Sequence, residues 1–72
     1  MERAAAMKTN KFEVLVANIG TVHNSFDEGV AYKIYMEYVS QSKAGFGRAA
    51  NESVILFRNE EIYREHESAY QE

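Results

Sequence analysis

The sequence predicts an α+β fold of two layers, in which one helix packs on a three-stranded sheet and the elements follow the order β-α-β-β. Three observations predict it: a complete helix signature over residues 25–43, an apolar β-branched stretch after residue 11, and two strand-like segments after residue 53. At 72 residues the chain is long enough for one domain with a single small core.

The first strand is predicted from residue 12 onwards, over about six to eight residues, because β-branched residues are frequent there. Its two sides are Phe12, Val14 and Val16, and Leu15, Ala17 and Ile19. Both sides are apolar. Residues 18–20 predict a bend, since Asn and Gly tolerate positive φ, and we expect residues 21–24 to lead directly into the helix.

The helix begins and ends with recognisable signals. Ser25 and Glu28 have the spacing of a capping box, and Asp27 is favourable at the positive end of the helix dipole. Lys43 lies in the predicted last turn, and Gly45 offers the left-handed conformation that commonly closes a helix.

The apolar arc of this helix is wider than contact with one sheet requires. Tyr32 and Met36, one turn apart, fall between the predicted buried stripe and the polar face. Tyrosine and methionine are enriched at protein interfaces, so these two residues are candidates for a docking patch. The alternative is that they lie at the edge of the core.

The second half of the sequence predicts a loop over residues 44–52, a buried strand over 53–57, a turn over 58–61 and a third strand over 62–66. The turn contains Asn59 followed by Glu60 instead of the usual Gly, which predicts a longer or imperfect loop. The third strand is charged and is therefore predicted at the sheet edge. Strands joined through a helix favour a right-handed crossover.

The predicted domain covers residues 11–67, preceded by a disordered leader over 1–10 and followed by a frayed tail over 68–72. One helix can cover only one side of the sheet, so either the side of Leu15 and Ala17 or the opposite side is left open. A folded-back leader, a second copy of the chain or a foreign partner could cover it.

Composition and spacing give no support for an enzyme. The net charge is -3 and the chain has no cysteine, which excludes disulfides and thiolate metal sites. His23 and His66 lack the spacing of a zinc site, and no nucleophile, base and orienting group occur together. We expect no cofactor and no metal. The absence of cysteine and of an apolar run of about 20 residues predicts a cytoplasmic protein.

Several segments resemble small proteins of unknown activity that phages and mobile elements carry. The segments are NIGTV at residues 18–22, YVSQSK at 38–43, GRAA at 47–50 and residues 54–65. In size, acidity and lack of catalytic motifs the chain is also similar to small anti-CRISPR proteins, which occupy a DNA-binding or subunit surface of bacterial immunity complexes. This resemblance implies a bacterial host cell and a host protein complex, such as a CRISPR–Cas effector subunit, as partner. It assigns no functional residue.

The first hypothesis is therefore a phage-type inhibitor that acts as a DNA mimic, because carboxylates can enter a groove lined by Lys and Arg. Its predicted partner-binding residues are Glu52, Glu60, Glu61, Glu65 and Glu67, with Tyr32 and Met36. The alternatives are a self-associating module such as a homodimer, and, least favoured, a nucleic-acid-binding protein. The last would use Lys8, Lys11, Lys33, Lys43 and Arg48.

Overall fold

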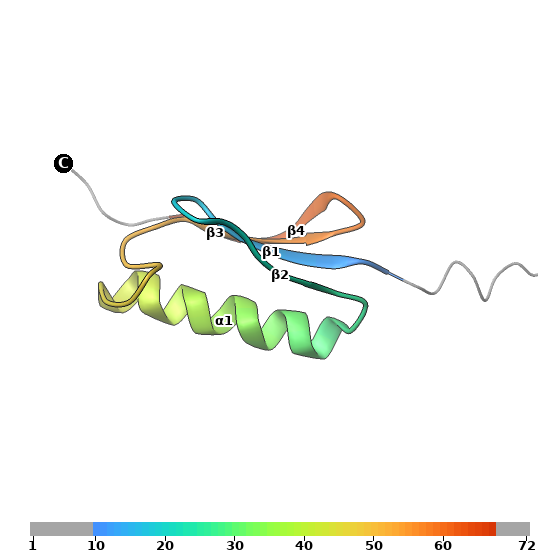
Figure 1. Ribbon diagram of the computed structural model, residues 1–72, viewed down its shortest axis with the longest axis horizontal. Coiled ribbons are helices and arrows are strands. Elements are labelled where there is room, and N and C mark those ends of the chain that lie inside the picture. The colour runs from blue at the N-terminus through green and yellow to red at the C-terminus, as the bar shows by residue number, and fades with distance from the viewer. Residues whose placement is uncertain (1–9, 68–72) are drawn as a thin grey trace, which may run out of the picture.

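A computed structural model describes residues 10–67, which form one helix packed on one face of a four-stranded antiparallel sheet (Figure 1). The elements are β1 (Phe12–Val16), β2 (Gly20–Ser25), α1 (Glu28–Ala44), β3 (Val54–Arg58) and β4 (Glu61–His66). The spatial order of the strands is β2-β1-β3-β4, and all neighbours are antiparallel. The α+β class is confirmed, but the sheet has four strands instead of three.

The additional strand is β2, which the sequence predicted as a connection to the helix. It contains one aliphatic residue, Val22, so it lacks the apolar alternation that identifies a strand. The chain turns back after β1, with a 2.9 Å hydrogen bond from the Ile19 amide to the Val16 carbonyl, and β2 then pairs along β1. This reversal makes β1 and β3 antiparallel neighbours. The two strands joined through α1 are therefore β2 and β3, which are parallel to each other with β1 between them.

The start of α1 also differs from the prediction. Asp27 is the N-cap, and its Oδ1 accepts a 3.0 Å hydrogen bond from the amide of Val30. Ser25 belongs to β2 and is too early in the chain to form a capping box with Glu28. At the other end the prediction is confirmed, because Gly45 has φ 75° and its amide donates to the Gln41 carbonyl at 2.9 Å.

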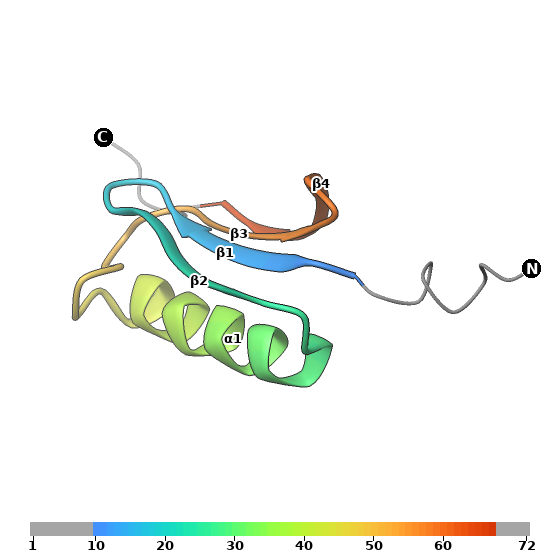
Figure 2. The ribbon, with the colours of Figure 1, turned by 45° about the vertical axis from the view of Figure 1, so that its right-hand side comes forward.

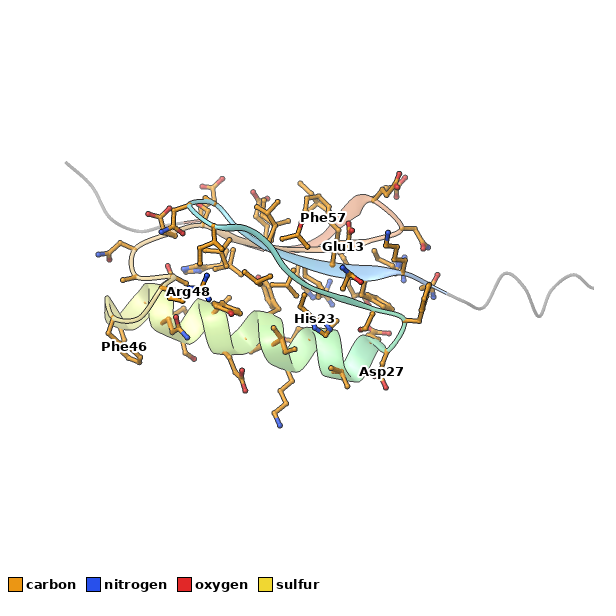
Figure 3. The ribbon with its side chains drawn as sticks, in the orientation of Figure 1. Glu13, His23, Asp27, Phe46, Arg48 and Phe57 are labelled. Atoms are coloured by element: carbon orange, nitrogen blue, oxygen red, sulfur yellow. The ribbon has the colours of Figure 1, made fainter. Side chains whose placement is uncertain are left out.

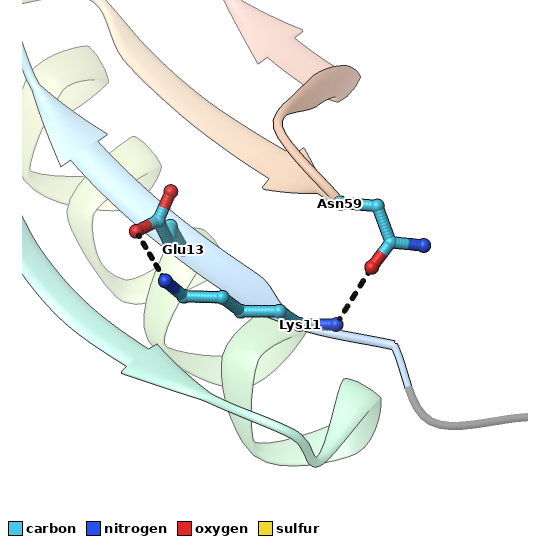
Figure 4. Close-up of polar contacts among 3 residues, drawn as sticks. All are labelled: Lys11, Glu13 and Asn59. Carbon is cyan, nitrogen blue, oxygen red and sulfur yellow. Dashed lines mark hydrogen bonds and ion pairs between the residues drawn. The ribbon is translucent and has the colours of Figure 1, made fainter. Parts of the chain in front are cut away.

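The β3–β4 connection is a two-residue turn, so it is not the longer of the two predicted forms, and Glu60 stands in it where Gly is usual. Asn59 and Glu60 both have positive φ, 52° and 72°, which is the requirement of a type I′ turn. The Asn59 amide donates to the Lys11 carbonyl at 2.8 Å, and its Oδ1 accepts from the Lys11 amide at 3.0 Å (Figure 4). These bonds fix the hairpin tip against the chain just before β1.

One residue of the predicted leader, Asn10, is among the described residues. The side chain of Asn10 accepts a 2.8 Å hydrogen bond from Nδ2 of Asn59, so this residue is bound to the tip of the β3–β4 hairpin. Residues 1–9 of the predicted leader and the predicted tail over residues 68–72 lie outside the described part of the chain.

The core lies between α1 and one side of the sheet. Buried side chains come from alternate positions of β1 and β3, from one stripe of α1 and from the loop before β3. They are Phe12, Val14, Val16, Ala31, Tyr35, Val39, Ala49, Val54 and Leu56. Because strand side chains alternate between faces, the intervening residues of β1 and β3 point away from α1.

Candidate functional site

The face of the sheet opposite α1 is a candidate binding surface. In the strand register Leu15 lies opposite Ile55, and Phe57 lies between Glu13 and Ile62. Figure 3 shows Glu13 and Phe57 on the side of the sheet away from α1. We call this side the open face. From the register of the four strands it comprises Glu13, Leu15, Thr21, Asn24, Ile55, Phe57, Ile62 and Glu65.

An apolar stripe crosses the open face. Leu15, Ile55 and Phe57 are half-buried among their neighbours, while Ile62 on the edge strand is 57% exposed. Within residues 10–67 no second layer of secondary structure covers this side (Figures 1 and 2). The prediction that one face stays open is therefore confirmed for the described chain, and the open side is the one that carries Leu15.

Charge is unevenly distributed along this stripe. Glu13 forms an ion pair with Lys11, with 3.6 Å between Nζ and Oε2 (Figure 4), so the β1 end is neutralised. Glu65, opposite Ile55 on β4, has no ion-pair partner among residues 10–67. The apolar stripe consequently ends in unbalanced negative charge at the β4 edge.

The predicted acidic residues do not form one continuous patch. Glu60 lies at the tip of the hairpin and is exposed. Glu61 is opposite Arg58, which is on the α1 side of the sheet, whereas Glu65 is on the open face. Glu67 follows the end of β4 and is exposed, and Glu52 lies in the loop before β3 and is partly buried. Of these five glutamates, only Glu65 belongs to the open face, and Glu60 lies beside it in the hairpin turn.

The predicted docking residues Tyr32 and Met36 lie on the other side of the sheet, on α1. Tyr32 and Met36 are 43% and 38% exposed, as expected for positions outside the buried stripe. The ring of Tyr32 lies 6.0 Å from that of Tyr35, and both belong to the flank of α1 that faces β4, because Glu28 on that flank bonds to Tyr63. The structure therefore does not bring Tyr32 and Met36 together with Glu65.

Sequence reasoning missed a cluster around Tyr63. The guanidinium carbons of Arg58 and Arg64 lie 4.6 Å and 4.5 Å from the centroid of the Tyr63 ring. The Tyr63 hydroxyl donates a 2.7 Å hydrogen bond to Glu28, and this bond is the main cause that raises the pKa of Tyr63. Strict alternation would place Tyr63 and Arg64 on opposite faces, but the register shift in β4 brings both to the α1 side.

The basic residues proposed for nucleic-acid binding are dispersed. Lys11 precedes β1, next to the N-terminal end of α1, and is paired with Glu13. Lys43 and Arg48 lie at the opposite end of α1, about 25 Å away for a helix of this length. Lys33 lies on the exposed side of the helix, and Lys8 is outside the described residues. The described residues therefore form no continuous basic surface.

The described chain offers no enclosed site. Residues 10–67 form no pocket and no group of three or more His, Asp or Glu side chains that could hold a metal ion. Nε2 of His23 lies 3.1 Å from the hydroxyl of Ser25, and Nε2 of His66 lies 3.2 Å from that of Ser42.

Tyr35 belongs to the core, and burial is the main cause that raises its pKa.

Comparison with known proteins adds no family to this description. No protein-family model matches the sequence, and neither a curated protein nor a solved structure matches the chain. The helix among the described residues is too short and too polar to cross a membrane.

Proposed function

We propose that this chain is a non-enzymatic binding protein, a phage-type inhibitor of a host nucleic-acid-handling complex. The open face and the adjacent acidic hairpin occupy a basic groove of the partner that otherwise holds DNA. The observation that carries the proposal is the apolar stripe of the open face, which ends at Glu65 without an ion-pair partner among residues 10–67.

The apolar part of the open face supports protein binding. A contiguous apolar surface rimmed by polar groups is typical of an interaction site, and burial of the stripe would contribute about 25 cal/mol per Å². Phe57 and Ile62 lie next to each other in the register, and Ile62 is the most exposed residue of the stripe. The stripe supplies affinity that carboxylates alone do not provide.

The acidic residues at the edge of the open face support a DNA-binding protein as the partner. Glu65 and the hairpin-tip residue Glu60 are exposed, and neither is neutralised within the described chain. A groove lined by Lys and Arg would attract these groups at long range and would accept carboxylates in place of phosphates. A partner that binds DNA provides such a groove, and its occupation blocks DNA.

A comparison of two charge reversals tests this function. Glu65→Lys changes the open face, whereas Glu37→Lys makes the same change of charge on the exposed side of α1. Each variant would be added to purified CRISPR–Cas effector complexes, and binding of the effector to labelled double-stranded target DNA would be measured at low and high salt. We expect Glu65→Lys to weaken inhibition by about tenfold or more and Glu37→Lys to change it little.

Two results would contradict this function. Equal inhibition by the wild type and Glu65→Lys would exclude the acidic mechanism. Absence of inhibition by the wild type across the effector panel would exclude these complexes as partners. If inhibition by Glu65→Lys no longer depended on salt, and circular dichroism showed an intact fold, the result would support charge pairing at this position.

The open face also favours a second candidate, a self-associating structural or regulatory module. The Lys11–Glu13 pair removes net charge from one end of the stripe, so two copies could bring their stripes together without strong repulsion there. Sedimentation at increasing concentration distinguishes the candidates. A dimer that Phe57→Ser dissociates supports self-association, and a strictly monomeric chain excludes it.

A further inference from the structure

A second surface, on the α1 side of the hairpin, is independent of the open face. Its members come from β3, β4 and one flank of α1, and we call it the arginine–tyrosine surface. It comprises Tyr32, Met36, Arg58, Tyr63 and Arg64. We propose that this surface binds an acidic segment of a protein partner, whose carboxylates the two guanidinium groups hold.

The two arginines are held in place before any ligand arrives. Each guanidinium lies within 4.6 Å of the centroid of the same Tyr63 ring, in a cation–π contact. Tyr63 is itself fixed by its hydrogen bond to Glu28 and by its ring contact with Phe12, with 6.2 Å between centroids. This support reduces the side-chain entropy that binding would otherwise remove.

Most hydrogen-bond donors of the pair have no partner among residues 10–67. A guanidinium has five N–H donors, and Arg64 uses one of its groups in a 2.9 Å bond from Nη1 to the Tyr63 carbonyl. No described carboxylate lies within 4.0 Å of either guanidinium. Arg58 and Arg64 are both exposed, so a carboxylate from outside can form bidentate bonds with them.

Local charge favours a protein segment over nucleic acid. Glu28 accepts from Tyr63, and Glu61 lies opposite Arg58, so two acidic residues accompany the two arginines. The local formal charge is therefore near zero, and the long-range field that attracts a polyanionic backbone is absent. Short-range pairing with one or two carboxylates does not need that field.

The neighbouring residues on α1 also fit a protein partner. Tyr32 and Met36 are exposed on the same flank of α1 as Glu28, whose carboxylate accepts the hydrogen bond from Tyr63, and the ring of Tyr32 lies 6.0 Å from that of Tyr35. Tyrosine, methionine and arginine are the residue types enriched in interface cores. The expected segment therefore combines carboxylates with at least one apolar side chain.

The proposal can be tested with a capped peptide of sequence Glu-Glu-Leu-Glu-Glu-Leu. Its binding would be followed through the arginine Nε resonances of the full chain by NMR. A matched peptide with Gln in place of Glu and a dodecamer of deoxythymidine are the comparison probes. We expect saturable shifts at Arg58 and Arg64 with the acidic peptide only.

Substitutions separate specific pairing from net charge. Arg64→Ala and Lys33→Ala each remove one positive charge, but Lys33 lies on the exposed side of α1. Arg64→Ala should weaken peptide binding by about tenfold, and Lys33→Ala should leave it within about twofold. Arg64→Lys keeps the charge but loses the planar fork, so it should resemble Arg64→Ala. Backbone NMR spectra would verify the fold of each variant.

Three outcomes would overturn the proposal. One is the absence of saturable shifts at both arginines with the acidic peptide. Another is a stronger response to the oligonucleotide, which would assign the surface to nucleic acid. The third is an equal loss in Arg64→Ala and Lys33→Ala, which would reduce the effect to net charge. None of these outcomes depends on the DNA-blocking activity proposed for the open face.

Discussion

The hydroxyl of Tyr63 donates a hydrogen bond of 2.7 Å to Oε2 of Glu28 and so joins the edge strand β4 to the first turn of α1. The packing of α1 is on β1, β2 and β3, so this bond and the Ser42–His66 contact tie β4 to the helix. Tyr63 is also the ring on which both arginines lie, so the bond positions the arginine–tyrosine surface.

The Tyr63–Glu28 bond predicts a pH-dependent stability. Glu28 raises the pKa of Tyr63 above its ordinary value of 10.0, because the bond requires the protonated phenol. The stabilisation is therefore complete below pH 10 and is lost as pH rises through the raised pKa. Urea unfolding of the wild type and Tyr63→Phe between pH 8 and pH 11 should show a stability difference that shrinks at high pH.

Tyr32→Phe is the matched control for this measurement, because the Tyr32 hydroxyl makes no hydrogen bond among residues 10–67. A stability difference between the wild type and Tyr63→Phe that is constant over the whole pH range would show that the bond does not form in solution.

The turn at Asn59 and Glu60 predicts a stabilising substitution. Glu60 has φ 72°, a conformation that glycine adopts without the steric cost that a Cβ imposes. We expect Glu60→Gly to raise the free energy of unfolding by about 0.5–1 kcal/mol in urea titrations. Glu60→Gln removes the same charge but keeps the Cβ, and an equal gain in that variant would attribute the effect to charge.

Much of this fold could be predicted because the core elements carry clear local signals. β1 and β3 were identified from apolar runs rich in β-branched residues, α1 from helical spacing and terminal signals, and Gly45 correctly marked the helix end. β2 escaped prediction because its sequence, GTVHNS, carries little apolar signal. It is a strand because of its pairing with β1, which is a tertiary interaction that local sequence does not encode.

The candidate site was less predictable for a related reason. The open face followed from one helix covering one side of the sheet, but the sides of individual β4 residues depend on a register shift at Tyr63. Strict alternation without that shift would place Glu61 and Glu65 on the same side of the sheet. The predicted acidic set consequently divides between two sides, and the arginine–tyrosine surface forms on one of them.

Leu56 and Phe57 are adjacent in β3 but point to opposite faces of the sheet. Leu56 is fully buried in the core, so Leu56→Ala should lower the free energy of unfolding by about 2–5 kcal/mol. Phe57 is half-buried on the open face, and Phe57→Ala should cost less than half as much in the free chain. Urea unfolding of both variants measures the two losses in free energy of unfolding. Equal losses would mean that the open face is covered in the monomer.

The helix start predicts a contrast between two residues. Asp27 caps α1 through the Val30 amide, so Asp27→Ala should cost about 1 kcal/mol in the free energy of unfolding. Ser25 contacts the amide of Asp27 at a longer distance of 3.4 Å, and Ser25→Ala should cost less. Urea unfolding would measure both losses, and a larger loss in Ser25→Ala would identify Ser25 as the functional cap.

The most direct measurement is NMR mapping of the labelled chain on addition of an effector complex that it inhibits. If the open face is the binding surface, line broadening and shift changes should centre on Leu15, Ile55, Phe57 and Glu65, and Glu65→Lys should remove them. Changes confined to the exposed side of α1 around Lys33 and Glu37, with the open face unaffected, would contradict the proposed function.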